Sequence, residues 1–328
     1  MRRVIPFAIA GALLVASAMT GLLLGPASLT PAELWRAVVS GEETPARTIL
    51  LAVRLPRVTA GILTGASLAV SGALFQALLR NPLAEPYLLG VQSGAALGAV
   101  AAITVGMSAL GAVSLPLAAF AGAVLAIALV FRVASSVGRL DTRILLLAGV
   151  VAGAFFTACV MLLFTLASAR ALQSAIFWTM GSLGQASWRM TAIVAAYALP
   201  AVVASVALGR HLNALALGEE TAAHLGTEVE RVKRLAYLLA SFLAAIAVSV
   251  AGVIGFVGLV VPHAVRMLWG ADHRRLIPLS FLGGGAVLVA ADSAARTAAA
   301  PLEIPVGVVM AFVGVPFFLV LLRRRYVR

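Results

Sequence analysis

Few residues in this chain have the type and spacing that catalysis or cofactor binding requires. A phosphate-binding loop needs a lysine directly after a glycine, then Ser or Thr, but the one lysine, Lys233, lies between Val232 and Arg234. Asp292 and Glu303 stand alone near the ends of apolar runs, so they form no chain of membrane carboxylates for proton relay. The histidines have no metal-ligand spacing: they are His211, His224, His263 and His273. We predict that the chain is not an enzyme and has no catalytic residue, metal site or cofactor.

The most distinctive charged groups are arginines at the end of a long apolar run. Arg54 and Arg57 precede the run 58–79, and a turn containing Asn81 and Pro82 follows it. The run is long enough to cross a bilayer as a helix. The arginines and the turn are therefore predicted to lie at opposite faces of a membrane.

The composition agrees with a membrane location. The 328-residue chain is 62% hydrophobic and 11% charged, whereas soluble domains carry about 25% charged residues. The net charge of +12 does not indicate nucleic-acid binding, because the basic residues lie between apolar runs, as topology-setting charges do. Cys159 lies alone inside an apolar run, so it cannot form an intrachain disulfide and is expected to pack. We predict an all-α polytopic membrane protein.

About ten transmembrane helices are expected. The apolar runs lie at about 4–24, 58–79, 87–105, 110–131, 144–169, 190–209, 235–251, 253–268, 276–295 and 304–322. Gly252 and Gly255 predict short or broken helices near 252–268, with one helix and a re-entrant segment as the alternative. The first run is longer than the apolar part of a signal peptide, so we expect it to be retained, with cleavage as the alternative.

The basic residues predict the orientation. Arg2 and Arg3 at one end, and Arg323, Arg324, Arg325 and Arg328 at the other, predict two cytoplasmic termini and so an even number of crossings. Ten spans place most of the 24 lysines and arginines on the cytoplasmic side. The remainder fall on the outer face: Arg36, Arg47, Arg54, Arg57, Arg170, Arg189 and Arg296. On that face, Thr30 and Pro31 predict a short capped helix over 31–39.

The loop between the sixth and seventh spans, about 210–230, contains two short helical patterns broken at Gly218 and Gly226. Four carboxylates lie among its basic residues: Glu219, Glu220, Glu228 and Glu230. Its apolar side is predicted to contain Leu212, Leu215, Ala216, Ala223 and Leu225. Such a helical elbow could dock in a groove on a soluble partner. An ordinary connecting loop is an equally good reading of the pattern alone.

Several motifs resemble those of the type II (FecCD-like) permease subunits of ABC importers for iron–siderophores, haem and cobalamin. The resemblance covers nearly the whole chain. It rests on Arg-Leu-Pro-Arg at 54–57, the segments 65–72, 80–86, 89–91, 145–150, 214–218 and 255–266, and the segments around Asp272, Asp292 and Glu303. Any one of these motifs would be weak alone, but their order along the chain is specific.

The resemblance implies a single permease domain over residues 1–328, multi-pass in the cell inner membrane. Two copies, or two different chains, would work with two ATPase subunits and a periplasmic binding protein, surrounded by lipid. The residues implied for binding-protein docking are Arg54, Arg57 and Arg296. Those implied for ATPase coupling are Ala214, Leu215, Leu217, Gly218, Glu219, Leu225 and Gly226. Those implied for the cytoplasmic gate are Asn81, Leu83, Thr142 and Arg143, where the charge of Arg143 departs from the family pattern.

The implied function is ATP-driven import of a bulky chelate by alternating access. We expect an iron–siderophore first, as the commonest cargo of the family, then haem or cobalamin. The alternative is a secondary transporter or channel without ATPase partners. That class predicts ion-coupling carboxylates at the membrane midplane, and none is evident in the sequence.

Overall fold

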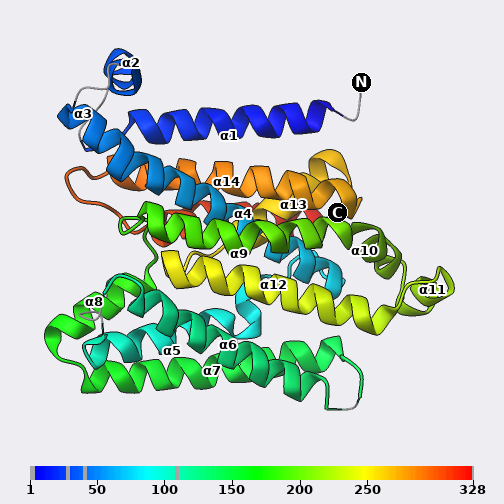
Figure 1. The fold of residues 1–328 in the computed structure, drawn as a ribbon. Helices are drawn as coiled ribbons and strands as arrows, with labels where there is room; N and C mark the ends of the chain where they lie inside the picture. Colours follow the sequence, from blue (N-terminus) through cyan, green and yellow to red (C-terminus); the bar gives the residue numbers. More distant parts are fainter. Residues whose placement is uncertain (1–3, 27–29, 40–42, 108–110, 137, 327–328) are drawn as a thin grey trace.

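The computed structural model describes residues 4–26, 30–39, 43–107, 111–136 and 138–326, and these residues form helices without a β-strand. The terminal residues Arg2, Arg3 and Arg328, which contributed to the predicted orientation, lie outside them. Figure 1 shows long helices lying side by side, with shorter ones at both ends of the bundle. The all-α prediction is confirmed.

Each of the ten predicted spans contains an apolar helix. Seven elements are long and apolar enough to cross a membrane: α1 (Ile5–Leu23), the continuous Pro45–Leu78, α6 (Ser114–Ala134), α7 (Thr142–Leu166), α9 (Trp188–Ala207), α12 (Val229–Ala251) and α14 (His273–Thr297). Three apolar helical stretches are shorter: α5 (Val91–Thr104), α13 (Val257–Trp269) and the Val306–Val320 part of α15 (Val306–Tyr326). The segment Pro45–Leu78 comprises α3 (Pro45–Thr48), the π-helix η1 (Ile49–Arg54) and α4 (Leu55–Leu78).

Apart from the 3₁₀ helix η2 (Pro86–Leu89), the remaining short helices mark the two ends of the bundle. At one end lie α2 (Pro31–Val39) and α8 (Ala169–Thr179), and at the other lie α10 (Gly209–Ala216) and α11 (Glu219–His224) (Figure 1). From the arginine distribution we call the first the outer end and the second the cytoplasmic end. Helix α1 begins and α15 ends toward the cytoplasmic end, as an even number of crossings requires.

Helix α2 begins as its sequence predicts. The Thr30 backbone N–H donates to Glu33 Oε2 (2.8 Å), and the Glu33 N–H donates to Thr30 Oγ1 (3.3 Å). This reciprocal arrangement is a capping box, which satisfies two backbone donors that a helix start otherwise leaves unpaired.

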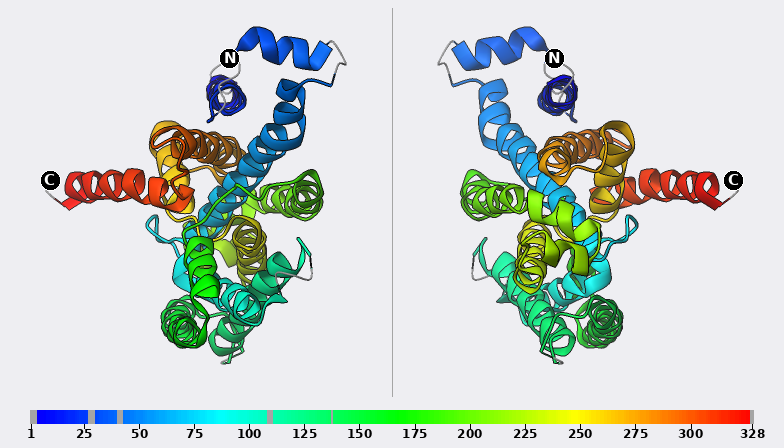
Figure 2. Two further views of the ribbon diagram at one scale, coloured as in Figure 1. Left: turned by 90° about the vertical axis from the view of Figure 1, so that its left-hand side faces the viewer. Right: turned by 90° about the vertical axis from the view of Figure 1, so that its right-hand side faces the viewer.

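Helix α4 is the central element. It is almost wholly buried, runs obliquely through the bundle (Figure 2), and contacts α9, α12, α13 and α14. Glycines permit these contacts: a Cβ on Gly72 would lie 1.9 Å from the Gly258 carbonyl oxygen, and one on Gly65 would lie 2.2 Å from that of Gly284. Small residues allow helices to pack backbone to backbone in a membrane.

The predicted break after α12 is also present. Residues 252–256 are non-helical, with positive φ at Gly252 (68°) and Phe256 (68°). The backbone groups freed by the break are bonded by side chains, because Phe256 N–H donates to Glu85 Oε1 (2.6 Å) and Ile254 N–H donates to the Tyr87 hydroxyl (3.1 Å). Non-helical backbone at membrane depth requires such internal partners.

Helix α15 departs from the bundle. Figure 2 shows it extending to one side, and its contacts are with α13 and α14 near its start. Its exposed apolar side chains include Phe312, Val313, Leu319 and Val320.

Candidate functional site

At the outer end, Arg57 joins two carboxylates from distant parts of the chain. Its Nη2 lies 2.9 Å from Asp292 Oδ1 on α14 and 3.0 Å from Glu303 Oε2 in the segment before α15. Its Nε adds a bond to Asp292 Oδ2 at 3.1 Å, and its Nη1 one to Glu303 Oε1 at 3.2 Å. The fork of a guanidinium suits such paired contacts to carboxylates.

Two further arginines join this outer cluster, which we define as Arg54, Arg57, Asp292, Arg296 and Glu303. Arg296 Nε lies 3.1 Å from Asp292 Oδ2, one helical turn away. Arg296 also donates to the carbonyls of Gly21 (3.1 Å) and Leu24 (3.2 Å), and Arg54 to those of Leu22 and Leu23. The carbonyls that end α1 are unsatisfied within the helix and favour cations.

The cluster changes the sequence-based view of this end. The three predicted docking arginines do lie together, but they are only 3%, 8% and 4% exposed at Arg54, Arg57 and Arg296, respectively. The expectation that Asp292 and Glu303 stand alone is wrong, since both bind Arg57. The four-residue spacing of Asp292 and Arg296 was the signal in the sequence for the bond between these two residues. Docking by the arginines stays a prediction.

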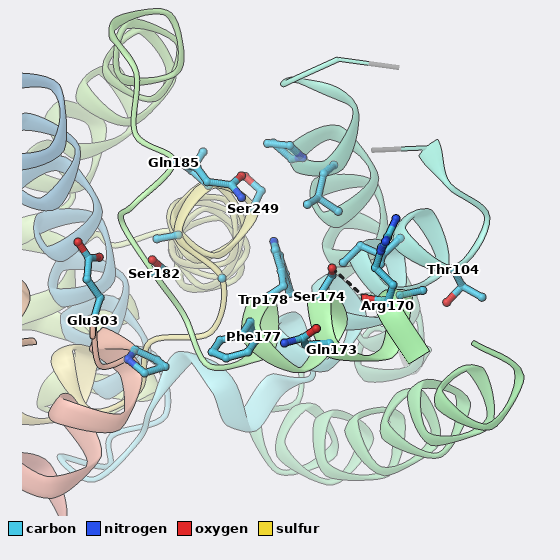
Figure 3. A pocket seen from close by; sticks show the side chains of 18 of the residues that line it. Thr104, Arg170, Gln173, Ser174, Phe177, Trp178, Ser182, Gln185, Ser249 and Glu303 are labelled. Atoms are coloured by element: carbon cyan, nitrogen blue, oxygen red, sulfur yellow. Dashed lines mark hydrogen bonds between the residues drawn. The ribbon is translucent and has the colours of Figure 1, made fainter. Parts of the chain in front are cut away.

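A cavity of about 780 Å³ opens beside the cluster at the outer end. Its wall combines the ends of α5, α6, α8 and α12 with the segments around Ser182 and Glu303. Most of its polar side chains are uncharged: Thr104, Gln173, Ser174, Ser182, Gln185 and Ser249. Phe177 and Trp178 add aromatic surface, and Figure 3 shows Arg170 and Glu303 on opposite sides. The cavity was not foreseen, because its lining comes from many separate segments.

A chamber with this lining can hold a bulky ligand by apolar contact and hydrogen bonds. Among the residues that the structure describes, no three His, Cys, Asp or Glu side chains lie close enough to hold a metal ion.

At the cytoplasmic end, α10 and α11 form the predicted elbow, with positive φ at Gly218 (121°) and Gly226 (78°). Leu212 and Leu215 are buried against the bundle, whereas Leu217 and Leu225 are 67% and 62% exposed. The predicted apolar side is therefore partly wrong, because Ala216, Ala223 and Leu225 face outward.

A concavity of about 560 Å³ lies on this elbow. Its lining includes four predicted coupling residues, Ala214, Leu217, Leu225 and Gly226, together with Arg210, His211, Asn213 and Thr227. The other predicted coupling residues serve the elbow itself: Leu215 is buried beneath it, Gly218 forms its bend, and Glu219 begins α11.

Asn213 attaches the elbow to the start of α14. Its Nδ2 donates to Asp272 Oδ1 (2.7 Å), and its Oδ1 accepts from the His273 N–H (2.8 Å). Asp272 is the N-cap of α14 and also accepts from the Arg274 N–H at 3.0 Å. The Asn213 amide, followed by the Arg274 N–H, holds the pKa of Asp272 below its usual range.

The predicted gate residues lie in two separate turns at the same end. Asn81 and Leu83 follow α4, and the Asn81 side chain accepts from the Leu83 N–H at 3.0 Å. Thr142 and Arg143 begin α7, where Asp141 is the N-cap. Bonds from the N–H groups of Ile144 and Arg143 lower the pKa of Asp141. The gate role itself stays a prediction.

Comparisons with known proteins agree with these features. The sequence matches the model of the FecCD transport family over residues 13–324. It is 47% identical to the cobalamin import system permease protein BtuC of Halobacterium salinarum, over 88% of this chain and 77% of that protein. It is 41% identical to the hemin transport system permease protein HmuU of Yersinia pestis, over 95% of this chain and 93% of that protein. A solved structure described as an inward-facing metal-chelate type ABC transporter covers 98% of this chain and 99% of its own, with 33% identity and a TM-score of 0.87.

Proposed function

Because this chain belongs to the FecCD transport family, we propose that it is the membrane subunit of an ATP-driven importer for a bulky metal chelate. The cargo would pass from a binding protein at the outer end to the cytoplasm. ATP would be hydrolysed by partner subunits, since the sequence contains no phosphate-binding loop of its own.

The observation that carries the proposal is the elbow of α10 and α11. It is anchored by buried Leu212 and Leu215 and by Asn213, yet it presents Leu217 and Leu225 outward beside a concavity. Exposed apolar side chains on a rigid helical projection mark a protein-docking surface. An ATPase subunit with a matching groove is the partner that this membrane location supports.

The outer end supports delivery of the cargo. The 780 Å³ cavity beside Glu303 is of a size that holds a substantial ligand. The outer cluster lies next to it, because Glu303 belongs to both. A binding protein with acidic contacts would meet the arginines only by competing with Asp292 and Glu303.

The cargo proposed first is a macrocyclic metal chelate, cobalamin or haem, with an iron–siderophore as the next candidate. This order differs from the one expected from the sequence, because two of the most similar relatives are named for cobalamin and hemin. The lining supports a ligand with a hydrogen-bonding edge and a flat apolar face, since amide and hydroxyl groups surround Phe177 and Trp178 (Figure 3).

A second copy of the chain would complete the path. Helix α15 extends away from the bundle, and Phe312, Val313 and Leu319 are exposed on it. Helix α7 has a second exposed apolar face, which includes Val151, Phe155 and Leu162 and is separate from α15. We propose a homodimer whose contact includes α15, with the cargo path between the two copies.

Transport would then follow alternating access. Closure of the ATPase pair would move the elbow, and the two permease copies would rock between outward and inward openings. The cargo would shift this equilibrium only by its different affinity for the two states.

The test is reconstitution in liposomes with the candidate ATPase and binding protein. Uptake of cyanocobalamin, hemin and a ferric siderophore is measured with ATP, with ADP and without the ATPase. We expect uptake of one cargo to require all three proteins and ATP. Uptake that persists without the ATPase would instead identify a secondary transporter or channel.

A further inference from the structure

The one lysine of the sequence occupies a buried position at the cytoplasmic end. Lys233 lies in the first turns of α12 and is only 3% exposed. Its Nζ lies 3.0 Å from Glu230 Oε1 on its own helix and 3.2 Å from Glu219 Oε2 at the start of α11. A buried ammonium needs such partners, because an unpaired charge in this position is strongly destabilising.

Each of these carboxylates also makes a second contact with its other oxygen. Glu219 Oε1 lies 3.2 Å from Arg80 Nη2, in the turn that follows α4. Glu230 Oε2 accepts a hydrogen bond of 2.8 Å from the backbone N–H of Leu140, in the loop that precedes α7. The result is a continuous series of contacts, Arg80–Glu219–Lys233–Glu230–Leu140, which we call the lysine relay.

The relay connects three parts of the chain whose roles were predicted separately. Arg80 immediately precedes the gate residue Asn81, and Leu140 lies two residues before the gate residue Thr142. Glu219 begins α11, the helix between the exposed Leu217 and Leu225 of the elbow. Glu219 thus links the elbow directly to the turn after α4, and Lys233 links it through Glu230 to the loop before α7.

The exposure of the members differs along the relay. The side chains of Arg80, Glu219 and Glu230 are 39%, 44% and 38% exposed, so their contacts can break and re-form in water at modest cost. The Lys233 ammonium is the fixed point between them. A displacement of α11 that moves Glu219 must either carry Lys233 and Arg80 with it or break both bonds.

We propose that Lys233 is a positioning residue that transmits the movement of the elbow to the loop before α7. The inference rests on the proposed function, in which a partner ATPase moves the elbow. Lys233 touches neither cargo nor ATP. Its role is to make the loop before α7 move together with the elbow, which Glu219 and Arg80 already join to the turn after α4.

The test compares K233M, which keeps the aliphatic stem, with K233R, which keeps the charge. The control is R231M, because Arg231 pairs with Glu228 at 3.5 Å on the exposed side of the same helix turn. Each variant is reconstituted with the ATPase and binding protein. The readout is the number of cargo molecules taken up per ATP hydrolysed.

We expect K233M to assemble and hydrolyse ATP but to lose at least tenfold in cargo per ATP, while K233R and R231M stay within twofold of the wild type. A wild-type number of cargo molecules per ATP in K233M overturns the inference, as does an equal loss in K233R and R231M.

If K233M does not fold, the double variant K233M/E230Q removes the buried charge together with its partner. It is judged by the same number of cargo molecules per ATP. Failure of the proposed function would appear differently, as a wild type without ATP-dependent uptake.

Discussion

Arg57 on α4 and Asp292 on α14 form a buried ion pair, with 2.9 Å between Nη2 and Oδ1, although 235 residues separate them in sequence. The two side chains are 10% and 4% exposed. The pair therefore joins the central helix to its main packing partner at the outer end of the bundle.

Removing one member of this pair is expected to be more harmful than removing both. D292A leaves Arg57 and Arg296 buried with one carboxylate fewer, and breaking such a pair costs about 3–5 kcal/mol. The double variant R57M/D292L exchanges the pair for apolar side chains and should recover part of that stability, because Arg296 loses Asp292 but keeps its bonds to the Gly21 and Leu24 carbonyls. Thermal unfolding in detergent measures both. A double variant that is less stable than D292A would contradict the expectation.

Glu303 offers a separate test of docking by Arg57. Its side chain is 42% exposed and holds Arg57 at 3.0 Å, so it competes with any acidic group of a binding protein. E303Q should strengthen binding of that protein by up to about fivefold, since a partly exposed charge pair contributes about 0.2–1 kcal/mol. The affinity is measured by titrating the binding protein onto the reconstituted permease.

The control for E303Q is E43Q, which removes an exposed carboxylate between α2 and α3 at the outer end. General repulsion of an acidic partner would make both variants bind more tightly. Unchanged or weaker binding to E303Q alone would show that Arg57 does not receive the partner's carboxylates.

The contact of α4 with α13 predicts a strict requirement for glycine at position 72. A methyl group there would meet the Gly258 carbonyl oxygen at 1.9 Å, which is backbone and cannot yield as a side chain would. G72A should therefore lower the free energy of unfolding by about 1–3 kcal/mol, as overpacking does. G11A on α1 is the matched control, because a Cβ at Gly11 has no atom within 4 Å. Similar unfolding temperatures for the two variants would refute the contact.

The sequence predicted those features that depend on local pattern. The apolar runs predicted the helices, Thr30 and Pro31 predicted the start of α2, and Gly218 and Gly226 predicted the bends of the elbow. Each of these follows from residues within one turn or one span of each other. The elbow shows the limit of this reasoning, because Leu225 fits an apolar pattern and is nevertheless 62% exposed.

Features that depend on distant partners were missed. The sequence displays Asp292, Glu303 and Lys233 as charges, but it does not show that each has a partner on another element. Phe256 is a second example: its φ of 68° is rare for a bulky residue, and Glu85, far away in sequence, binds its N–H. Such pairs arise only once the helices are packed.

The bond between Asn213 and Asp272 predicts a pH dependence of stability. The native pKa of Asp272 is lowered, so the unfolded state, with a pKa of about 3.9, binds the proton more readily. The stabilisation is therefore complete above about pH 5 and is lost as the pH falls through the unfolded value toward the native one. D272N keeps an acceptor for Asn213 and Arg274 without titrating.

The difference in unfolding temperature between the wild type and D272N should hence shrink or reverse between about pH 5 and pH 3. Measuring the difference cancels the titration of the other carboxylates. If the unfolding temperatures of the wild type and D272N change in parallel over this range, the bonds to Asp272 do not lower its pKa in the folded chain.

Leu217 is expected to belong to the ATPase contact and not to the core of the permease. Its side chain is 67% exposed beside the concavity of the elbow, so L217E should leave the unfolding temperature within a few degrees of the wild type. The charge would be buried without a partner on docking, and a loss of about tenfold or more in ATPase association is expected.

V38E is the control, because Val38 is 58% exposed on α2 at the outer end, away from any cytoplasmic partner. Co-purification and ATP-dependent uptake measure the effect. Normal association of L217E would place the ATPase elsewhere, whereas equal losses in L217E and V38E would point to damage of the membrane bundle.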